Sequence, residues 1–152
     1  MKVKKNRWGV GLLCLVSCVF AACAHDTLGY AVVQSPPTDG WKRQQPLSFE
    51  VPVKDSLSLF RIDITSRFRN HYTSNLFLAV LQVTAPSGDQ FCDTLSFPIT
   101  HTYNRLWNDF KFPYCSHVQF AQKGTWRFTV WHCMEENELK GVSAIGLYIE
   151  KE

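Results

Sequence analysis

Apolar and polar residues alternate one by one along much of this 152-residue chain, and that period limits what the chain can fold into. In residues 47–54 every second residue, from Leu47 to Val53, is apolar. A period of two places these side chains on one face of an extended strand, whereas a helix needs apolar residues three or four apart. The pattern predicts a half-buried β-strand. Pro52 should lie at a sheet edge, since proline cannot donate to a strand ladder.

Similar segments follow to the end of the chain. Residues 76–83 are apolar on both faces, which predicts a central strand. Residues 135–140 are expected to form a helical turn. Seven or eight strands separated by short turns predict an all-β fold, an antiparallel β-sandwich that is jelly-roll-like. The other predicted strands are residues 57–68, 91–99, 110–112, 118–120, 125–132 and 142–150.

The N-terminus has the pattern of an export signal. Four basic residues precede an apolar run from Trp8 to Ala22 and small residues before Cys23. The run of 15 residues suits a signal peptide but is shorter than the roughly 20 residues of a transmembrane helix. Phe20-Ala21-Ala22-Cys23 fits a lipoprotein signal box, although an aromatic residue stands where leucine is usual. We therefore predict lipid attachment at Cys23.

Other readings of this stretch stay open. Leu15-Val16-Ser17-Cys18 also fits the lipoprotein box, but processing there would leave an apolar region of only about ten residues. An ordinary secretory signal or a retained helix is a further alternative. With Cys23 as the anchor, the chain divides into a signal peptide (residues 1–22), an extended tether (23–40) that includes Pro36-Pro37, and a β-sandwich domain (41–152).

Removal of residues 1–22 changes the charge. Of the 16 basic residues, four lie in the signal, which leaves 12 against 13 acidic residues and a net charge of about −1. The basic balance of the full chain therefore belongs to its export signal. Nothing in the mature charge predicts nucleic-acid binding.

Three cysteines, Cys92, Cys115 and Cys133, remain in the domain. In an exported protein two of them could form a disulfide, or all three could be buried thiols. Their wide spacing does not resemble the paired cysteines of a zinc site.

No pattern in the sequence predicts catalysis, a metal site, a cofactor or a small-molecule substrate. The histidines are scattered, and a nucleophile elbow and a glycine-rich phosphate loop are both missing from the sequence. His132 and Cys133 are adjacent, but neighbours on a strand point to opposite faces and cannot act as a pair. We therefore expect a protein that is not an enzyme.

Two further features suggest either glycan binding or glycosylation. Trp41, Trp107 and Trp131 are candidates for stacking against glycan rings, so a surface glycan-binding module is the alternative function. Three tripeptides also match Asp-Ser/Thr-aliphatic sites of O-glycosylation in exported proteins of Bacteroidetes, although such sequences are common in turns. They are Asp26-Thr27-Leu28, Asp55-Ser56-Leu57 and Asp93-Thr94-Leu95.

A set of short motifs follows Cys23 along the chain in a fixed order. The motifs are Tyr30, Gly40-Trp41-Lys42, Leu47-Ser48-Phe49-Glu50-Val51, Arg69-Asn70-x-Tyr72-x-x-Asn75-Leu76, Asp93-Thr94-Leu95, Gly124-x-Trp126-x-Phe128, Met134 and Leu139-Lys140-Gly141-Val142-x-x-Ile145-Gly146-Leu147. In their order and spacing they resemble the GldH family of gliding-motility lipoproteins from Bacteroidetes. The resemblance covers nearly all of the mature chain and supports Cys23, because Tyr30 and Trp41 then lie at the usual distances from the anchor.

The resemblance implies a component of the gliding machinery or a related assembly in the cell envelope, lipid-anchored to the inner or the outer membrane. Its expected partners are membrane lipid and other envelope or gliding proteins. Two places depart from the family pattern: Glu135 follows Met134 where arginine is frequent, and residues 104–109 replace a glycine-rich stretch. The family implies no catalytic residues.

The polar loop of residues 69–75 is the candidate site outside the core. Asn70 and Asn75 suit left-handed or side-chain-bonded turns, and Tyr72 is placed to cover the end of the sandwich. Together with Arg69 they are predicted to serve either the structure of the loop or the binding of a partner.

Overall fold

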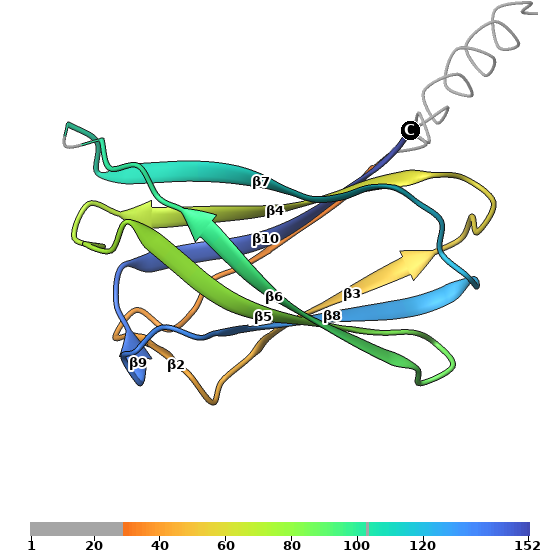
Figure 1. The fold of residues 1–152 in the computed structure, drawn as a ribbon, viewed down its shortest axis with the longest axis horizontal. Coiled ribbons are helices and arrows are strands. Elements are labelled where there is room, and N and C mark those ends of the chain that lie inside the picture. Colours follow the sequence, from red (N-terminus) through yellow and green to blue (C-terminus); the bar gives the residue numbers. More distant parts are fainter. Residues whose placement is uncertain (1–28, 103) are drawn as a thin grey trace, which may run out of the picture.

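The computed structural model describes residues 29–102 and 104–152, and these form two facing antiparallel sheets (Figure 1). One sheet has the strand order β1-β10-β4-β7, the other β3-β8-β5-β6, and β2 pairs separately with β9. The strands are β1 (Gly29–Gln34), β2 (Trp41–Lys42), β3 (Leu47–Val53), β4 (Phe60–Arg69), β5 (Leu76–Thr84), β6 (Gln90–Pro98), β7 (Trp107–Val118), β8 (Gly124–His132), β9 (Glu138–Leu139) and β10 (Val142–Lys151).

The predicted all-β sandwich is confirmed. Eight of the ten strands in the described part of the chain have six or more residues, and their order in the two four-stranded sheets is that of a jelly roll. The ten strands exceed the predicted seven or eight because β1, β2 and β9 were not anticipated. Two predicted short strands near residues 110 and 118 belong instead to one long strand, β7.

The sequence pattern placed the main strands correctly. β3 is an edge strand, as Pro52 predicted. β5 lies between β8 and β6, as its two apolar faces predicted. In β10 the side chains of Ile145, Leu147 and Ile149 are all buried between the sheets.

The segment predicted as a tether contains a strand of the domain. Residues 29–34 form β1, which pairs with β10 from Gly29 opposite Glu150 to Gln34 opposite Ile145. The side chains of Tyr30 and Gln34 donate to the carbonyl oxygens of Glu50 and Ser48 in β3. These bonds join the neighbouring edges of the two sheets, and they give Tyr30 a structural role.

The helical turn predicted at residues 135–140 is wrong. Glu138 and Leu139 form β9, which pairs with Lys42 and Trp41 of β2. The Trp41 side chain is buried beneath this small ribbon, with its indole N–H donating to the Gln45 carbonyl at 2.6 Å. Burial of Trp41 and Leu139 stabilises the extended pairing in place of a helical turn.

Several predictions concern residues outside the described part of the chain. They are the signal peptide at residues 1–22, both candidate lipid sites (Cys18 and Cys23), the first part of the tether and the tripeptide at residues 26–28. Within residues 29–102 and 104–152, none of the secondary structure is a helix of the length and apolarity that a membrane span requires.

Candidate functional site

Most of the motif residues outside the strands gather at one end of the sandwich, at the left of Figure 1. There β4 ends and β5 and β10 begin. We call this end the motif pole and define it as residues 69–76, 104–107 and 134–141. It is built from three connections that are far apart in the sequence, and Arg69 N–H joins two of them by donating to the Gly141 carbonyl at 2.7 Å.

Tyr72 is the buried centre of the motif pole. Its side chain is 3% exposed and its ring lies 4.5 Å from the ring of Phe68. The hydroxyl donates to the Leu76 carbonyl at 2.8 Å. Burial raises the pKa of Tyr72 to about 12, so the hydroxyl is protonated at neutral pH and remains a donor. The residue closes the loop on itself and covers the end of the core.

Met134 packs behind Tyr72. Its sulfur accepts the backbone N–H of Leu78 at 3.2 Å and lies 4.0 Å from the Tyr72 hydroxyl. The thioether therefore satisfies a backbone donor of β5 where the strand ladder is interrupted. Cys133 N–H, one residue earlier, donates to the Leu78 carbonyl at 2.8 Å. The Met134 motif thus fixes residues 133–134 to β5.

The other half of the loop faces solvent. The guanidinium of Arg69 lies over the ring of Trp107, 4.9 Å from its centroid, and both side chains are exposed. Asn70 donates its backbone N–H to the carbonyl of Leu106, whose side chain is 70% exposed. The loop brings a cation, an aromatic ring and an exposed leucine together on one surface.

Asn70 and Asn75 do not adopt the left-handed conformation proposed for them. Among the described residues the one non-glycine with positive φ is His117. Both asparagine side chains are exposed, and Asn75 contributes through its backbone carbonyl, which accepts from Ile99 N–H at 2.8 Å. The loop is held by backbone bonds and by Tyr72, so the asparagine side chains stay available at the surface.

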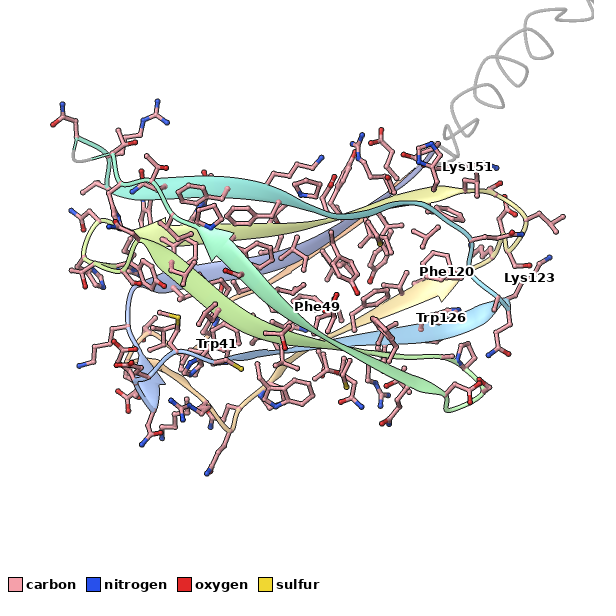
Figure 2. The ribbon with its side chains drawn as sticks, viewed as in Figure 1. Trp41, Phe49, Phe120, Lys123, Trp126 and Lys151 are labelled. Carbon is pink, nitrogen blue, oxygen red and sulfur yellow. The ribbon has the colours of Figure 1, made fainter. Side chains whose placement is uncertain are left out.

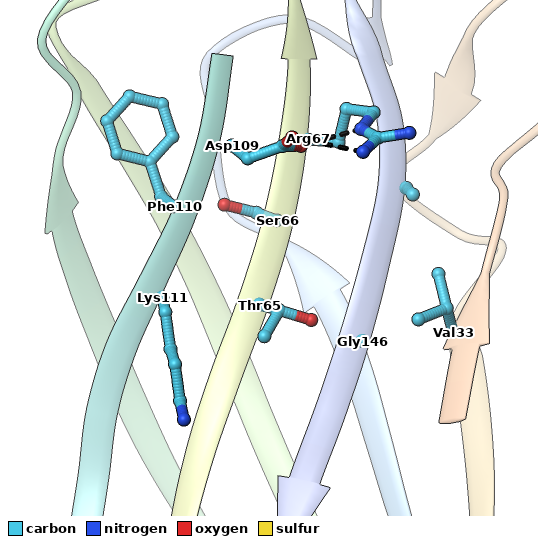
Figure 3. Close-up of a pocket in the computed structure, with 9 residues that line it drawn as sticks. Val33, Thr65, Ser66, Arg67, Asp109, Phe110, Lys111 and Gly146 are labelled. Atoms are coloured by element: carbon cyan, nitrogen blue, oxygen red, sulfur yellow. Dashed lines mark hydrogen bonds and ion pairs between the residues drawn. The ribbon is translucent and has the colours of Figure 1, made fainter. Parts of the chain in front are cut away.

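A groove of about 430 Å³ runs along the outer face of the β1-β10-β4-β7 sheet (Figure 3). Its floor includes Gly146, whose lack of a side chain opens the space between Val33 and Thr65. Arg67 and Asp109 lie at its wall and pair with each other at 2.6 Å. Because these two charges neutralise each other, neither is a free charged group for binding a ligand in the groove.

The three tryptophans predicted to stack on sugars differ in their exposure to solvent. Trp41 is buried, which removes it as a surface platform. Trp131 is half-buried on β8. Trp107, 42% exposed at the start of β7, is the one that faces solvent well enough to stack on a ligand.

The three domain cysteines are free thiols. Cys92 and Cys133 are exposed and Cys115 is half-buried, so the alternative of three buried thiols is wrong for two of them. Burial raises the pKa of Cys115 to about 11, which makes it a poor nucleophile. Cys133 is exposed whereas the neighbouring His132 is fully buried, as their positions on opposite faces predicted.

In the described part of the chain, no group of three or more His, Cys, Asp or Glu side chains is placed to hold a metal ion. The two tripeptides that lie in described residues differ in exposure, with Thr94 exposed on edge strand β6 and Ser56 half-buried in the β3–β4 loop. The fold and the motif pole define a β-sandwich with an ordered surface loop.

Comparison with known proteins identifies the family of this domain. The family model described as GldH lipoprotein matches residues 29–149, which run from the first strand to the last. The chain therefore belongs to the GldH lipoprotein family, and the resemblance read from the motifs is confirmed. The matched region starts at Gly29, the first residue of β1.

Two curated relatives agree with the family. The chain is 28% identical over 127 residues to the gliding motility lipoprotein GldH homolog of Christiangramia forsetii, with 73% of this chain and 77% of the relative covered. It is 25% identical over 125 residues to the gliding motility lipoprotein GldH of Flavobacterium johnsoniae, with the same coverage. Among solved structures, dimeric latent PorU from Porphyromonas gingivalis matches with a TM-score of 0.38 and 8% identity over 82% of this chain and 13% of PorU.

Proposed function

We propose that this protein is a lipoprotein of the cell envelope, attached to membrane lipid through an acylated Cys23, and that it acts as a non-enzymatic component of a gliding-motility or related envelope assembly. Membership of the GldH lipoprotein family supports the anchor and the assembly. The exposed half of the residue 69–75 loop is the observation that carries the binding role. Its bonded backbone holds Arg69 next to Trp107 at the surface.

The composition of this surface suits a protein partner. Arginine and tryptophan are enriched among the residues that carry most of the binding energy of protein interfaces. Leu106 and Leu76 extend the apolar area, at 70% and 38% exposed. Because the loop is already ordered by Tyr72 and by backbone bonds, binding would cost little conformational entropy.

The test separates binding from folding. Arg69→Ala and Trp107→Ala are made in the full-length protein, and the variants are compared by melting temperature and by the envelope proteins that co-purify from detergent-solubilised membranes. Arg127→Ala and Phe91→Ala serve as matched controls, since both side chains are exposed on the other sheet. We expect the two pole variants to keep their melting temperature and lose association, whereas the controls keep both. Full co-purification by the pole variants would contradict the proposal.

A glycan-binding module is the second candidate, and the exposed ring of Trp107 at the start of β7 favours it. Arg69 already covers one face of that ring, which leaves a single face for a sugar. A glycan array probed with the purified protein and with Trp107→Ala tests it. Binding that disappears in the variant supports this candidate, and no binding to any polysaccharide removes it.

A further inference from the structure

The end of the sandwich opposite the motif pole carries an unusually exposed leucine. Leu57 is 83% exposed in the connection between β3 and β4, and Leu59 is 41% exposed. β4 starts at this end and runs to the motif pole. We call this end the Leu57 pole and define it as residues 54–59, 85–89 and 119–123 with the start of β1 and the end of β10. Figure 2 shows Lys123 and Lys151 at this end and Trp41 towards the other.

The loop that carries Leu57 is held in place. The Asp55 carboxylate accepts the backbone N–H of Leu57 at 2.9 Å and of Ser58 at 3.2 Å. Lys151 from β10 pairs with the same carboxylate at 2.9 Å. The Gln119 side chain donates to the Ser56 carbonyl at 2.8 Å. The leucine is therefore presented to solvent by an ordered loop, and its exposure is not the result of a loose chain.

The chain enters the domain at the same pole. β1 begins at Gly29, opposite Glu150, and the next residue of β10 is the Lys151 that holds Asp55. Cys23 precedes Gly29 by six residues, and six residues span at most about 20 Å when fully extended. An acylated Cys23 would keep the Leu57 pole within that distance of the lipid surface.

We propose that the Leu57 pole rests on the membrane, with Leu57 inserted at the boundary between the lipid headgroups and the acyl chains and the motif pole directed away from the bilayer. The inference rests on the proposed lipid attachment at Cys23. Exposed Lys54 and Lys123 flank the leucine, but Asp89 is exposed at the same end, so the contact is apolar and does not require anionic lipid. The orientation leaves Arg69 and Trp107 accessible to a partner.

The test uses the full lipoprotein, purified from membranes and reconstituted into phosphatidylcholine vesicles. Leu57→Trp is compared with Leu106→Trp, the matched control at the motif pole, where the leucine is 70% exposed. Fluorescence is measured in vesicles with and without bromine on the acyl chains. Bromine should quench the fluorescence added at position 57, because a side chain at the headgroup–acyl boundary touches the acyl chains, and should leave the fluorescence added at position 106 unchanged.

Flotation of the vesicles distinguishes the two proposals. Protein that floats while position 57 is not quenched overturns the orientation and leaves the lipid anchor standing. Quenching at position 106 also overturns the orientation. Protein that does not float overturns the anchor and this inference with it. A sugar found on Ser56 by mass spectrometry would overturn the insertion of Leu57, since a glycan on the preceding residue would hold the leucine in water.

Discussion

Gly141 and Tyr72 meet backbone to backbone at the motif pole. A Cβ atom on residue 141 would lie 3.0 Å from both the backbone nitrogen and the Cα of Tyr72, closer than folded proteins normally allow. Gly141 also has a φ of +87°, a conformation that costs other residues strain. Two motifs far apart in the sequence, Arg69 to Leu76 and Leu139 to Leu147, are thus parts of one contact.

Gly141→Ala should therefore destabilise the protein more than backbone strain alone explains. Gly88→Ala is the matched control, because Gly88 has a φ of +94° but no atom lies within 4 Å of the position that a Cβ would take there. We expect the control to lower the free energy of unfolding by about 1 kcal/mol and Gly141→Ala by about 3 kcal/mol. Urea unfolding measures both. Equal losses would show that the contact with Tyr72 adds nothing.

A buried carboxylate on the outer face of one sheet provides a second test. The Asp63 side chain is 4% exposed and accepts Arg61 at 3.2 Å and Lys111 at 3.0 Å. Asp63→Asn should cost about 1–3 kcal/mol, because it leaves two cations without their shared partner. Asp109→Asn breaks a pair whose carboxylate is 63% exposed and should cost less than about 1 kcal/mol. Denaturant unfolding measures the free energy of unfolding of both variants. A larger loss for Asp109→Asn than for Asp63→Asn would contradict this role of Asp63.

His132 should make stability depend on pH. Its ring is fully buried against Trp41, and burial lowers the pKa of His132 below the usual value of 6.5. The folded state therefore keeps the imidazole neutral while the unfolded chain takes up a proton. Stability is unaffected well above pH 6.5 and decreases by up to about 1.4 kcal/mol per pH unit below it.

The measurement compares unfolding free energies at about pH 7.5 and about pH 5.5. His132→Leu should flatten the dependence whatever its own effect on stability. An unchanged slope in His132→Leu would show that other groups cause the loss.

Thiol reactivity should divide the three domain cysteines two to one. Cys92 and Cys133 are exposed, whereas burial raises the pKa of Cys115 to about 11. A disulfide reagent at about pH 8 should modify two thiols rapidly and the third after denaturation. Cys115→Ser should keep both rapid equivalents. Three rapid equivalents in the native protein would contradict the burial of Cys115.

The alternation of apolar residues was sufficient for the sandwich, because one buried face per strand leaves a period of two in the sequence. It located β3, β4, β8 and β10, and the apolar run of residues 76–83 located β5. It missed β1, a short strand followed closely by Pro36-Pro37, which has the composition of a linker. Its place is set by pairing with β10 and by the bonds of Tyr30 and Gln34, which are not local signals.

The candidate site was predicted in part. Tyr72 was predicted as a candidate because it is a lone aromatic residue in a polar loop. In the structure its side chain is buried at the end of the core. The roles of Met134 and Gly141 could not be read from the sequence, because Met134 acts through Leu78 of β5 and Gly141 through Tyr72 of the β4–β5 loop, and both partners are distant along the chain. The stacking of Arg69 on Trp107 depends on the pairing of β4 with β7, which is also distant along the chain.

The proposed function requires that the domain is held to a membrane through Cys23. Mass spectrometry of the mature N-terminal peptide tests it most directly. We predict a peptide that begins at Cys23 and carries fatty acyl chains, and a Cys23→Ser variant that is neither processed nor labelled by palmitate. A mature chain that begins at Cys18, or one that begins at an unmodified residue, would contradict the claim.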